Sequence, residues 1–305
     1  MESIHLGHSN ILSSRLVYGC MRICDFEGPD AREQGLRALR TAIDEGYTHF
    51  DLADIYSGGK SEMLFSELLK ENPSLRDDLI ITSKCGIRFK GRPDAGDPTR
   101  FDFSKAYIVQ SVEGSLSRLG IEQLDILLLH RPDFLMCAEE VAEAFSQLHE
   151  EGKVKHFGVS NFQPSQVSLL QKSLSQKLLA NQIEINIHNV DSLYDGTLDQ
   201  CQELGISPQA WCPLGGVVYP AWGNTFTKED EQRIQEEFCR QAEKYETEHW
   251  IIMLAWLLKH PANILPVVGT TNPDRIKAAK RSLELSYSRE DWYCLLEARN
   301  GKPAT

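Results

Sequence analysis

Eight short apolar runs recur along the chain, and each is followed by a loop and then by a segment with helical periodicity. The runs are continuous, as in the letters LDILLL, and do not alternate between apolar and polar positions. Continuous runs of this kind are typical of parallel strands that are covered on both faces. They lie at residues 16–21, 48–53, 79–84, 124–130, 156–160, 180–186, 207–212 and 264–268.

Segments with apolar positions every three or four residues lie between and after these runs. They predict helices at residues 31–45, 62–70, 105–119, 138–151, 164–175, 193–204, 228–245, 250–259, 272–281 and 289–299. Residues 1–15 show short apolar alternations around Gly7 and Asn10, which indicate a small hairpin. Eight strand-and-helix units in a chain of this length predict one (β/α)8 TIM barrel domain over residues 1–305, with an N-terminal β-hairpin cap.

A doubly wound open sheet is the competing fold, because it also alternates strands and helices. A G-x-G-x-x-G fingerprint after the first strand would favour it, and no such pattern follows residues 16–21. We therefore expect the closed barrel. The longest polar segment rich in glycine and proline, residues 86–99, is expected to be a loop.

The composition narrows the class of protein. A net charge of −12 argues against nucleic-acid binding, because phosphates require a basic surface. No run reaches the roughly 18 to 20 apolar residues of a membrane span, and the first residues lack the pattern of a signal peptide. The eight cysteines form no C-x-x-C pair, so we expect reduced thiols in the cytoplasm, with a structural disulfide as the minor alternative.

Reactive side chains of such a barrel gather at the carboxyl ends of its strands. The second run delivers Asp51, and Tyr56 follows in the loop after it, just before the turn formers Gly58 and Gly59. A carboxylate and a tyrosine hydroxyl at this place indicate proton transfer. Taken alone, the two residues fit a structural aspartate and a core tyrosine equally well.

Lys84 ends the third run and His130 ends the fourth. An ammonium at the tip of an apolar strand is costly to bury unless it is paired, and Asp51 is the expected partner. A lysine charge close to Tyr56 would move the phenol pKa downward and make the phenol a better proton donor near neutral pH. His130 would hydrogen-bond a substrate oxygen from the other side, so that the four groups polarise a carbonyl.

These residues and their spacing resemble the aldo/keto reductase superfamily. The resemblance rests on D-x-A-x-x-Y at residues 51–56, on Lys84, on His130, on GVSNF at residues 158–162 and on VVGTTNPDRI at residues 267–276. The segments LLLHRPDFLM, EEGKVKHFGVSNF and WCPLGG look most like its branch of bacterial cytosolic oxidoreductases. The resemblance implies a reductase that works without a metal and passes hydride from a nicotinamide cofactor to an aldehyde or ketone.

The resemblance also implies a role for each residue. Tyr56 would be the general acid, Lys84 and Asp51 would tune it, and His130 would orient the carbonyl. The implied contacts on the nicotinamide and pyrophosphate side are Ser160, Asn161 and Gln182 at the carboxamide, Trp211 on the ring with Cys212 after it, and Leu214, Gly215 and Gly216 in the loop over the pyrophosphate.

The adenosine side of the cofactor is expected at the end of the eighth strand. Arg275 opens a helix where its guanidinium can bind a phosphate bidentately, which favours NADPH over NADH. Many relatives carry a lysine where this chain has Gly269, and an acid–amide pair where it has Ala278 and Ala279, so we expect a looser grip on adenine. The implied contacts on this side are Gly269, Thr270, Thr271 and Arg275.

Loops that follow the strands are expected to border the substrate. The candidates are Arg22, Asp25, Phe89, Arg131, Phe134 and residues 218–222, and residues 217–227 are expected to close over the cofactor. Plainer interpretations remain for three features. Ser160 and Asn161 also fit a strand-end cap, Trp211 also fits packing at the rim, and Arg275 also fits a solvated helix charge.

Three other functions compete with the reductase. A metal-dependent hydrolase would need clustered ligands such as H-x-H after the first strand, which are absent from the sequence. A Schiff-base lyase would use Lys84 as its nucleophile. A non-catalytic redox sensor or regulatory subunit would bind the nucleotide and report to a partner. We expect the carbonyl reductase, with a small-molecule substrate, no metal, no nucleic-acid or membrane partner, and an oligomeric state that the sequence leaves open and that a monomer would fit.

Overall fold

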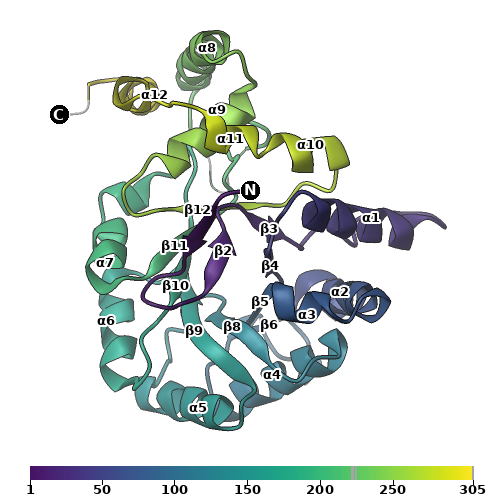
Figure 1. Ribbon diagram of the computed structural model, residues 1–305. Helices are drawn as coiled ribbons and strands as arrows, with labels where there is room; N and C mark the ends of the chain where they lie inside the picture. The colour runs from purple at the N-terminus through teal and green to yellow at the C-terminus, as the bar shows by residue number, and fades with distance from the viewer. Residues whose placement is uncertain (221–222, 224, 304–305) are drawn as a thin grey trace.

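The computed structural model describes residues 1–220, 223 and 225–303, and its centre is a closed barrel of eight parallel strands (Figure 1). The ring runs β10-β11-β12-β3-β4-β5-β8-β9, and β12 pairs with β3 to close it. The predicted barrel is therefore confirmed. The strands are β3 (Val17–Gly19), β4 (His49–Asp51), β5 (Ile80–Cys85), β8 (Leu124–Leu129), β9 (Val154–Ser160), β10 (Ala180–Glu184), β11 (Ser207–Trp211) and β12 (Leu265–Val268).

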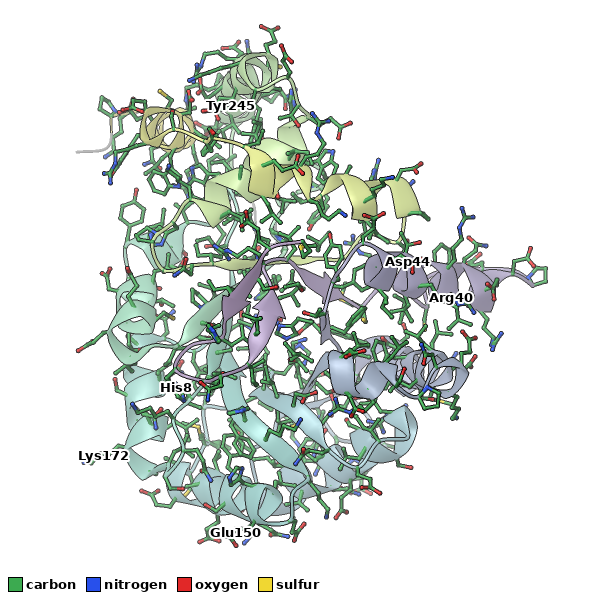
Figure 2. All side chains as sticks on the ribbon, viewed as in Figure 1. His8, Arg40, Asp44, Glu150, Lys172 and Tyr245 are labelled. Carbon is green, nitrogen blue, oxygen red and sulfur yellow. The ribbon has the colours of Figure 1, made fainter. Side chains whose placement is uncertain are left out.

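Helices surround the barrel and cover its outer face (Figure 1). They are α1 (Ala31–Asp44), α2 (Lys60–Glu71), α3 (Leu75–Asp78), α4 (Lys105–Leu119), α5 (Ala138–Glu150), α6 (Pro164–Ser173), α7 (Thr197–Leu204), α8 (Lys228–Lys244), α9 (His249–Leu258), α10 (Pro273–Ala278), α11 (Arg281–Glu284) and α12 (Arg289–Asn300). Figure 2 shows Arg40, Glu150 and Lys172 on the solvent side of α1, α5 and α6. The apolar stripes face the strands, as the helical periodicity predicts.

The N-terminal hairpin, β1 (Ser3–His5) and β2 (Leu12–Ser14), lies across the end of the barrel where the strands begin (Figure 1). The backbone N–H of Gly7 donates to Ser207 Oγ at 2.7 Å, and that of Ser14 donates to Thr48 Oγ1 at 2.9 Å. Leu6 of the hairpin packs with apolar side chains of the barrel interior. This end is closed, which leaves the carboxyl ends of the strands for chemistry.

The segment predicted as a plain loop, residues 86–99, contains part of a second small sheet. Strand β6 (Ile87–Arg88) follows directly after β5 and pairs antiparallel with β7 (Arg100–Phe101), which comes just after this segment. Gly86 joins β5 to β6 with φ +113°, and a Cβ there would lie 2.3 Å from Cε1 of Phe103. Glycine is therefore required at this close approach.

Helices α8 and α12 pack against each other outside the main ring (Figure 1). The carboxylate of Asp291 on α12 accepts hydrogen bonds from Lys244 at 2.5 Å, Tyr245 at 2.5 Å and Arg240 at 2.7 Å. Burial alone would raise the pKa of this carboxyl, but these donors hold the pKa well below its usual range. The carboxylate therefore stays charged and ties the two helices together.

All eight cysteines lie in the described part of the chain and are free thiols. Burial raises the pKa of Cys85 well above its ordinary value and also raises the pKa of Cys212. Neither thiol is therefore activated as a nucleophile. In the same part of the chain, no helix is both long and apolar enough to cross a membrane.

Candidate active site

Neighbouring strands bring Asp51, Lys84 and Tyr56 into direct contact. Lys84 is fully buried at the end of β5, and its ammonium donates to Asp51 Oδ2 at 2.6 Å, to the Leu52 carbonyl at 2.9 Å and to Tyr56 Oη at 3.0 Å. All three N–H donors of the lysine are therefore engaged. Because Tyr56 Oη accepts from Lys84, its own proton remains to be donated elsewhere.

The pKa of Tyr56 differs from the sequence-based expectation. Lys84 does lower the phenol pKa, as expected, but burial raises it and repulsion from Asp51 raises it further, so the pKa lies above its ordinary value. The expected net direction was wrong because burial of the phenolate and the nearby carboxylate together outweigh the attraction of one cation. Lys84 shows the opposite balance: burial lowers its pKa, but Asp51 and Tyr56 raise it by more.

His130 follows β8 on the other side of Tyr56. The two rings are edge to face, with centroids 5.9 Å apart. Burial lowers the pKa of His130 well below its ordinary value, and Lys84 and Arg131 lower it further. The imidazole is therefore neutral near pH 7 and suited to hydrogen-bond a carbonyl oxygen. We refer to Asp51, Tyr56, Lys84 and His130 as the tetrad.

Tyr56 lies on a short 3-10 turn, η1 (Tyr56–Gly59), and a buried carboxylate holds Arg118 against the end of this turn. Glu62 is fully buried, accepts from Ser83 Oγ at 2.7 Å and from Arg118 Nε at 2.6 Å. Gly59 has φ +88°, and a Cβ there would lie 2.8 Å from Arg118 Cδ. Sequence reasoning missed this support, although Glu62 ends the stretch that carries Asp51 and Tyr56.

Asp54 is a second buried carboxyl beside this turn. Its Oδ1 is buried and has no hydrogen-bond partner among the described residues. Burial, followed by repulsion from Glu62, raises its pKa from 3.8 to about 7. Sequence reasoning missed Asp54, which stands between two of the predicted catalytic residues.

Replacing Asp54 with Asn is expected to stabilise the protein in a pH-dependent way. The folded chain keeps the Asp54 proton between pH 3.8 and about 7, where the unfolded chain has released it. The wild-type free energy of unfolding therefore falls as the pH rises through this window. The gain from Asp54→Asn should grow from pH 5 to pH 8, where it is on the order of 1 to 4 kcal/mol. Urea unfolding at the two pH values, with the exposed Asp77→Asn as control, measures it; an equal gain at both would contradict the role of burial.

The residues expected at the nicotinamide carboxamide are bonded to one another at the ends of β9 and β10. Ser160 Oγ donates to the Gln182 carbonyl at 2.7 Å and accepts from Asn161 Nδ2 at 2.9 Å. Trp211 Nε1 donates to Asn161 Oδ1 at 2.8 Å. Asn161 has φ 62°, a left-handed conformation that this residue type tolerates. Trp211 thus fixes the Asn161 amide, a contact that the sequence did not indicate.

Gln182 links these residues to the tetrad. Its Nε2 donates to Asp51 Oδ1 at 2.8 Å and to Gln209 Oε1 at 2.9 Å. Both N–H groups are then used, and Oε1 is left to accept a hydrogen bond. Gln209 is fully buried, and its Nε2 has no partner among the described residues. Sequence reasoning missed Gln209, because the direction of a side-chain amide inside a barrel has no sequence signal.

The loop expected over the pyrophosphate begins at the end of β11. Cys212 has φ 53°, the N–H of Gly215 donates to the Cys212 carbonyl at 3.1 Å, and Leu214 follows on the same turn. The N–H of Gly216 donates to the Tyr219 carbonyl at 2.8 Å. Gly216 has φ +83°, and a Cβ there would lie 2.5 Å from Cδ2 of His188. Glycine is needed at this position on both grounds.

The segment after β12, where the adenosine side is expected, has an open backbone. A Cβ on Gly269 would meet only the Gly19 carbonyl oxygen, 3.9 Å away. Thr270 Oγ1 accepts from the N–H of Asn272, and Thr271 lies between them, partly exposed. Arg275 is exposed in the first turns of α10, and no hydrogen bond from its side chain is present among the described residues. This guanidinium is available for a phosphate.

Two arginines predicted to border the substrate lie over aromatic rings at the same end of the barrel. Arg22 Cζ is 5.3 Å from the Tyr219 ring centroid, and Arg131 Cζ is 5.0 Å from that of Trp211. Phe134 is 87% exposed, Phe89 is 47% exposed, and Asp25 is exposed. Of residues 218–222, residues 221 and 222 lie outside the described part. In the described part of the chain, no three His, Cys, Asp or Glu side chains form a group that could hold a metal.

Comparison with known proteins identifies relatives over nearly the whole chain. A family model described as the aldo/keto reductase family matches residues 15–299. The oxidoreductase YdhF of Escherichia coli is 39% identical over 94% of this chain and 94% of its own length. A 6-dehydroglucose reductase of Agrobacterium fabrum is 40% identical over 95% of each chain, and an uncharacterised oxidoreductase, YcsN of Bacillus subtilis, is 38% identical over 99% of each.

Solved structures match the fold over the same extent. A thermostable aldo-keto reductase in complex with the inhibitor epalrestat has a TM-score of 0.81 and 26% identity, covering 98% of this chain and 100% of the other. The holo form of AKR11C1 from Bacillus halodurans has a TM-score of 0.82 and 24% identity, covering 98% of this chain and 96% of the other. The barrel and its helices are thus shared with these proteins.

Proposed function

Because the chain belongs to the aldo/keto reductase family, we propose that it reduces an aldehyde or ketone to an alcohol with NADPH as the hydride donor and Tyr56 as the proton donor. Family membership makes it a nicotinamide-dependent oxidoreductase acting on carbonyl groups. The observation that carries the residue roles is the buried Lys84 ammonium, which donates to Asp51 and to Tyr56 at once.

The tetrad can deliver one proton to a carbonyl oxygen. A dihydronicotinamide, when bound, would supply the hydride. Neutral His130 hydrogen-bonds the oxygen and holds it near Tyr56 Oη, whose proton is not used within the protein. When Tyr56 gives up this proton, Lys84 stabilises the phenolate, and Asp51 keeps the lysine charged and in place. The raised pKa of Tyr56 keeps the hydroxyl protonated before the reaction.

The contacts at the carboxyl ends of the strands suit a nicotinamide dinucleotide. Gln182 would accept from the carboxamide through Oε1, and Ser160 and Asn161, fixed by one another, would bond the rest of it. The ring of Trp211 would stack on the nicotinamide. Cys212 and the backbone of residues 214–216 would follow the pyrophosphate. Gly269, Thr270, Thr271 and Arg275 would hold the adenosine side.

Replacing Arg275 with Ala is expected to weaken NADPH much more than NADH. The exposed guanidinium would pair with the 2′-phosphate, which NADH lacks, and a charge-assisted bidentate pair contributes about 1.5 to 3 kcal/mol, or roughly 10- to 150-fold in Kd. Fluorescence titration with both cofactors measures the two losses. Arg281→Ala, a nearby exposed arginine, is the control. Equal losses for NADPH and NADH would remove the phosphate contact.

A titration with NADPH followed by a turnover assay tests the function as a whole. Loss of absorbance at 340 nm should be followed with simple aldehydes and quinones, and with 6-dehydroglucose because a relative of 40% identity carries that activity in its name. Turnover of any of these supports the reductase. Tight NADPH binding without turnover of any carbonyl would favour a redox sensor, and absence of NADPH binding would contradict the proposal.

A further inference from the structure

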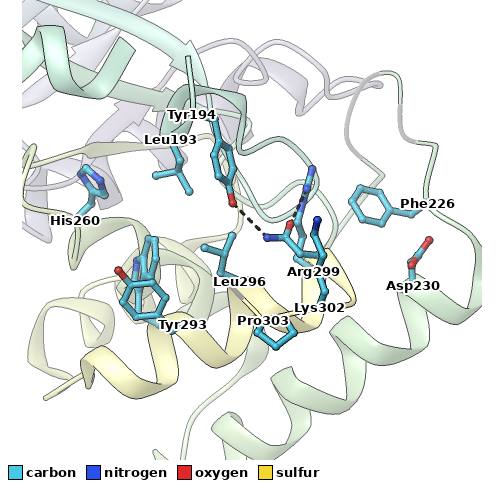
Figure 3. Close-up of a pocket in the computed structure, with 12 residues that line it drawn as sticks. Leu193, Tyr194, Phe226, Asp230, His260, Tyr293, Leu296, Arg299, Lys302 and Pro303 are labelled. Carbon is cyan, nitrogen blue, oxygen red and sulfur yellow. Dashed lines mark hydrogen bonds between the residues drawn. The ribbon is translucent and has the colours of Figure 1, made fainter. Parts of the chain in front are cut away.

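A groove separate from the tetrad lies between the η2 turn (Asp191–Leu193), the start of α8 and the end of α12. Its volume is about 730 Å³, within the range of small-molecule sites. None of the tetrad and none of the expected cofactor contacts from Ser160 to Arg275 lines it, although Phe226 belongs to the segment expected to close over the cofactor. Figure 3 shows Tyr194, Phe226 and Tyr293 around the groove, with Arg299 and Lys302 between them.

The walls of the groove are aromatic. Tyr194, Phe226, Trp292 and Tyr293 all line it. Trp292 is immobilised by stacking on Trp256 at 4.9 Å with an interplanar angle of 3°. Tyr194 and Tyr293 are 66% and 42% exposed, so much of each side chain is left open by the described residues. Such walls suit a flat ligand.

The charge of the groove is positive although the chain carries −12 overall. Arg299 and Lys302 are its cations. The carboxylate of Asp230 also lies there, but it is engaged by Arg233 at 2.6 Å and by the hydroxyl of Thr227 at 2.8 Å. The groove therefore favours an anion.

The guanidinium N–H groups of Arg299 make only weak or no hydrogen bonds to the described residues. Its Nη1 donates to Asn300 Oδ1 at 2.9 Å, its Nη2 donates to the His188 carbonyl at 3.3 Å, and its buried Nε has no partner among the described residues. Asn300 Nδ2 in turn donates to Tyr194 Oη at a long 3.3 Å. These partners are neutral oxygens, so an anionic group is a stronger acceptor for the same donors.

The groove is joined to the loop around Gly216 by a stack of side chains. Arg299 Cζ lies 5.1 Å from the Phe226 ring centroid, and the Phe226 ring stacks on His188 at 4.8 Å and 18°. His188 packs directly against Gly216. A ligand against Phe226 and Arg299 would therefore stabilise the position of His188, on which this loop rests.

We propose that this groove binds a flat aromatic anion, a carboxylate or sulfonate, and that its occupancy tightens cofactor binding through Phe226, His188 and Gly216. The aromatic walls favour such a ligand over free phosphate, and the two cations Arg299 and Lys302 favour it over a neutral aromatic ring. The effect on cofactor binding rests on the proposed role of residues 214–216 over the pyrophosphate. The binding of the anion depends on the groove alone.

The probe is 8-anilinonaphthalene-1-sulfonate, titrated by fluorescence into the full chain saturated with NADP+, which keeps the probe out of the catalytic end. One saturable site is expected. Arg299→Gln should weaken binding about tenfold or more, the loss of one charge-assisted contact. Tyr194→Ala should weaken it severalfold by removing a wall. Arg289→Gln, an exposed arginine at the other end of α12, should leave it unchanged.

Melting curves show whether Arg299→Gln folds, and Tyr194→Ala carries the test if it does not. Equal affinity in wild type and the folded variants would overturn the site. Displacement of the probe when NADP+ is added to a chain loaded with the probe alone would overturn it as well. For the coupling, NADPH should bind about fivefold tighter with the probe present, and the gain should vanish in Arg299→Gln. Probe binding without any change in NADPH affinity would overturn the coupling alone. Failure of NADPH to bind at all would reject the proposed function. The comparison of probe affinity between wild type, Arg299→Gln and Tyr194→Ala would still test the groove.

Discussion

Replacing Tyr56 with Phe is expected to lower kcat by about two to four orders of magnitude, because loss of a positioned general acid typically costs about 10²- to 10⁴-fold. The Phe ring keeps the packing of η1 and the edge-to-face contact with His130, and only the hydroxyl is lost. Cofactor affinity should therefore stay within a few fold of wild type. Single-turnover measurement of the 340 nm absorbance separates this loss from cofactor release.

Tyr107→Phe is the matched control, since the hydroxyl of this tyrosine donates to the Ile87 carbonyl at 3.1 Å and is not bonded to Lys84. It should retain most of the turnover. If Tyr56→Phe turned over at a rate comparable to wild type, the general acid would have to be another group. A large loss of NADPH affinity in the same variant would assign Tyr56 to binding and not to proton transfer.

Replacing Lys84 with Met is expected to abolish measurable turnover and to destabilise the fold by about 3 to 5 kcal/mol, the usual cost of leaving one charge of a buried pair without its partner. The methionine has nearly the same length as the lysine, so the packing is kept. The carboxylate of Asp51, which is 2% exposed, loses the bond from Lys84 and keeps the bond from the Gln182 amide. Urea unfolding measures the loss of stability, and the carbonyl reduction assay measures the loss of rate.

The double variant Asp51→Asn with Lys84→Met separates the two effects. Removing both charges should recover most of the lost stability, because no uncompensated charge remains buried. It should not recover the rate, because Tyr56 would still lack the cation that stabilises its phenolate. A double variant with restored turnover would show that Lys84 acts only by neutralising Asp51.

The barrel followed from the sequence because its signal is repeated and local. Each strand is a continuous apolar run, and each helix has its own period, so errors of up to four residues at the ends did not change the topology. Strands β6 and β7 were not predicted, because strands of two residues are too short to show an alternation of apolar and polar positions. The helix expected from residue 193 begins at Thr197, after Gly196 in a left-handed conformation.

The active site followed only in part. The positions of the expected strand ends were enough to predict the tetrad, because the carboxyl ends of parallel strands meet at one end of the barrel. The sign of the Tyr56 pKa shift did not follow, because the sequence identifies a neighbouring cation but not how much water the phenol has lost. Gln209 and Asp54 were missed for a related reason: burial of a polar atom without a partner is visible only in three dimensions.

The pairing that closes the barrel has a consequence for synthesis of the chain. Three strands that are consecutive in the ring, β4, β5 and β8, can pair while the chain is still emerging from the ribosome. They carry Asp51 and Lys84, and His130 directly follows β8. β3 can pair with β4 early, but its other edge has to wait, because its second partner, β12, lies near the other end of the chain. Arg15, just before β3, likewise bonds to the Ile264 carbonyl 249 residues away. Until then β3 presents an unpaired edge, and such long-range closure is slow. The nascent protein therefore depends on its last strand both to finish folding and to hide an edge that invites aggregation.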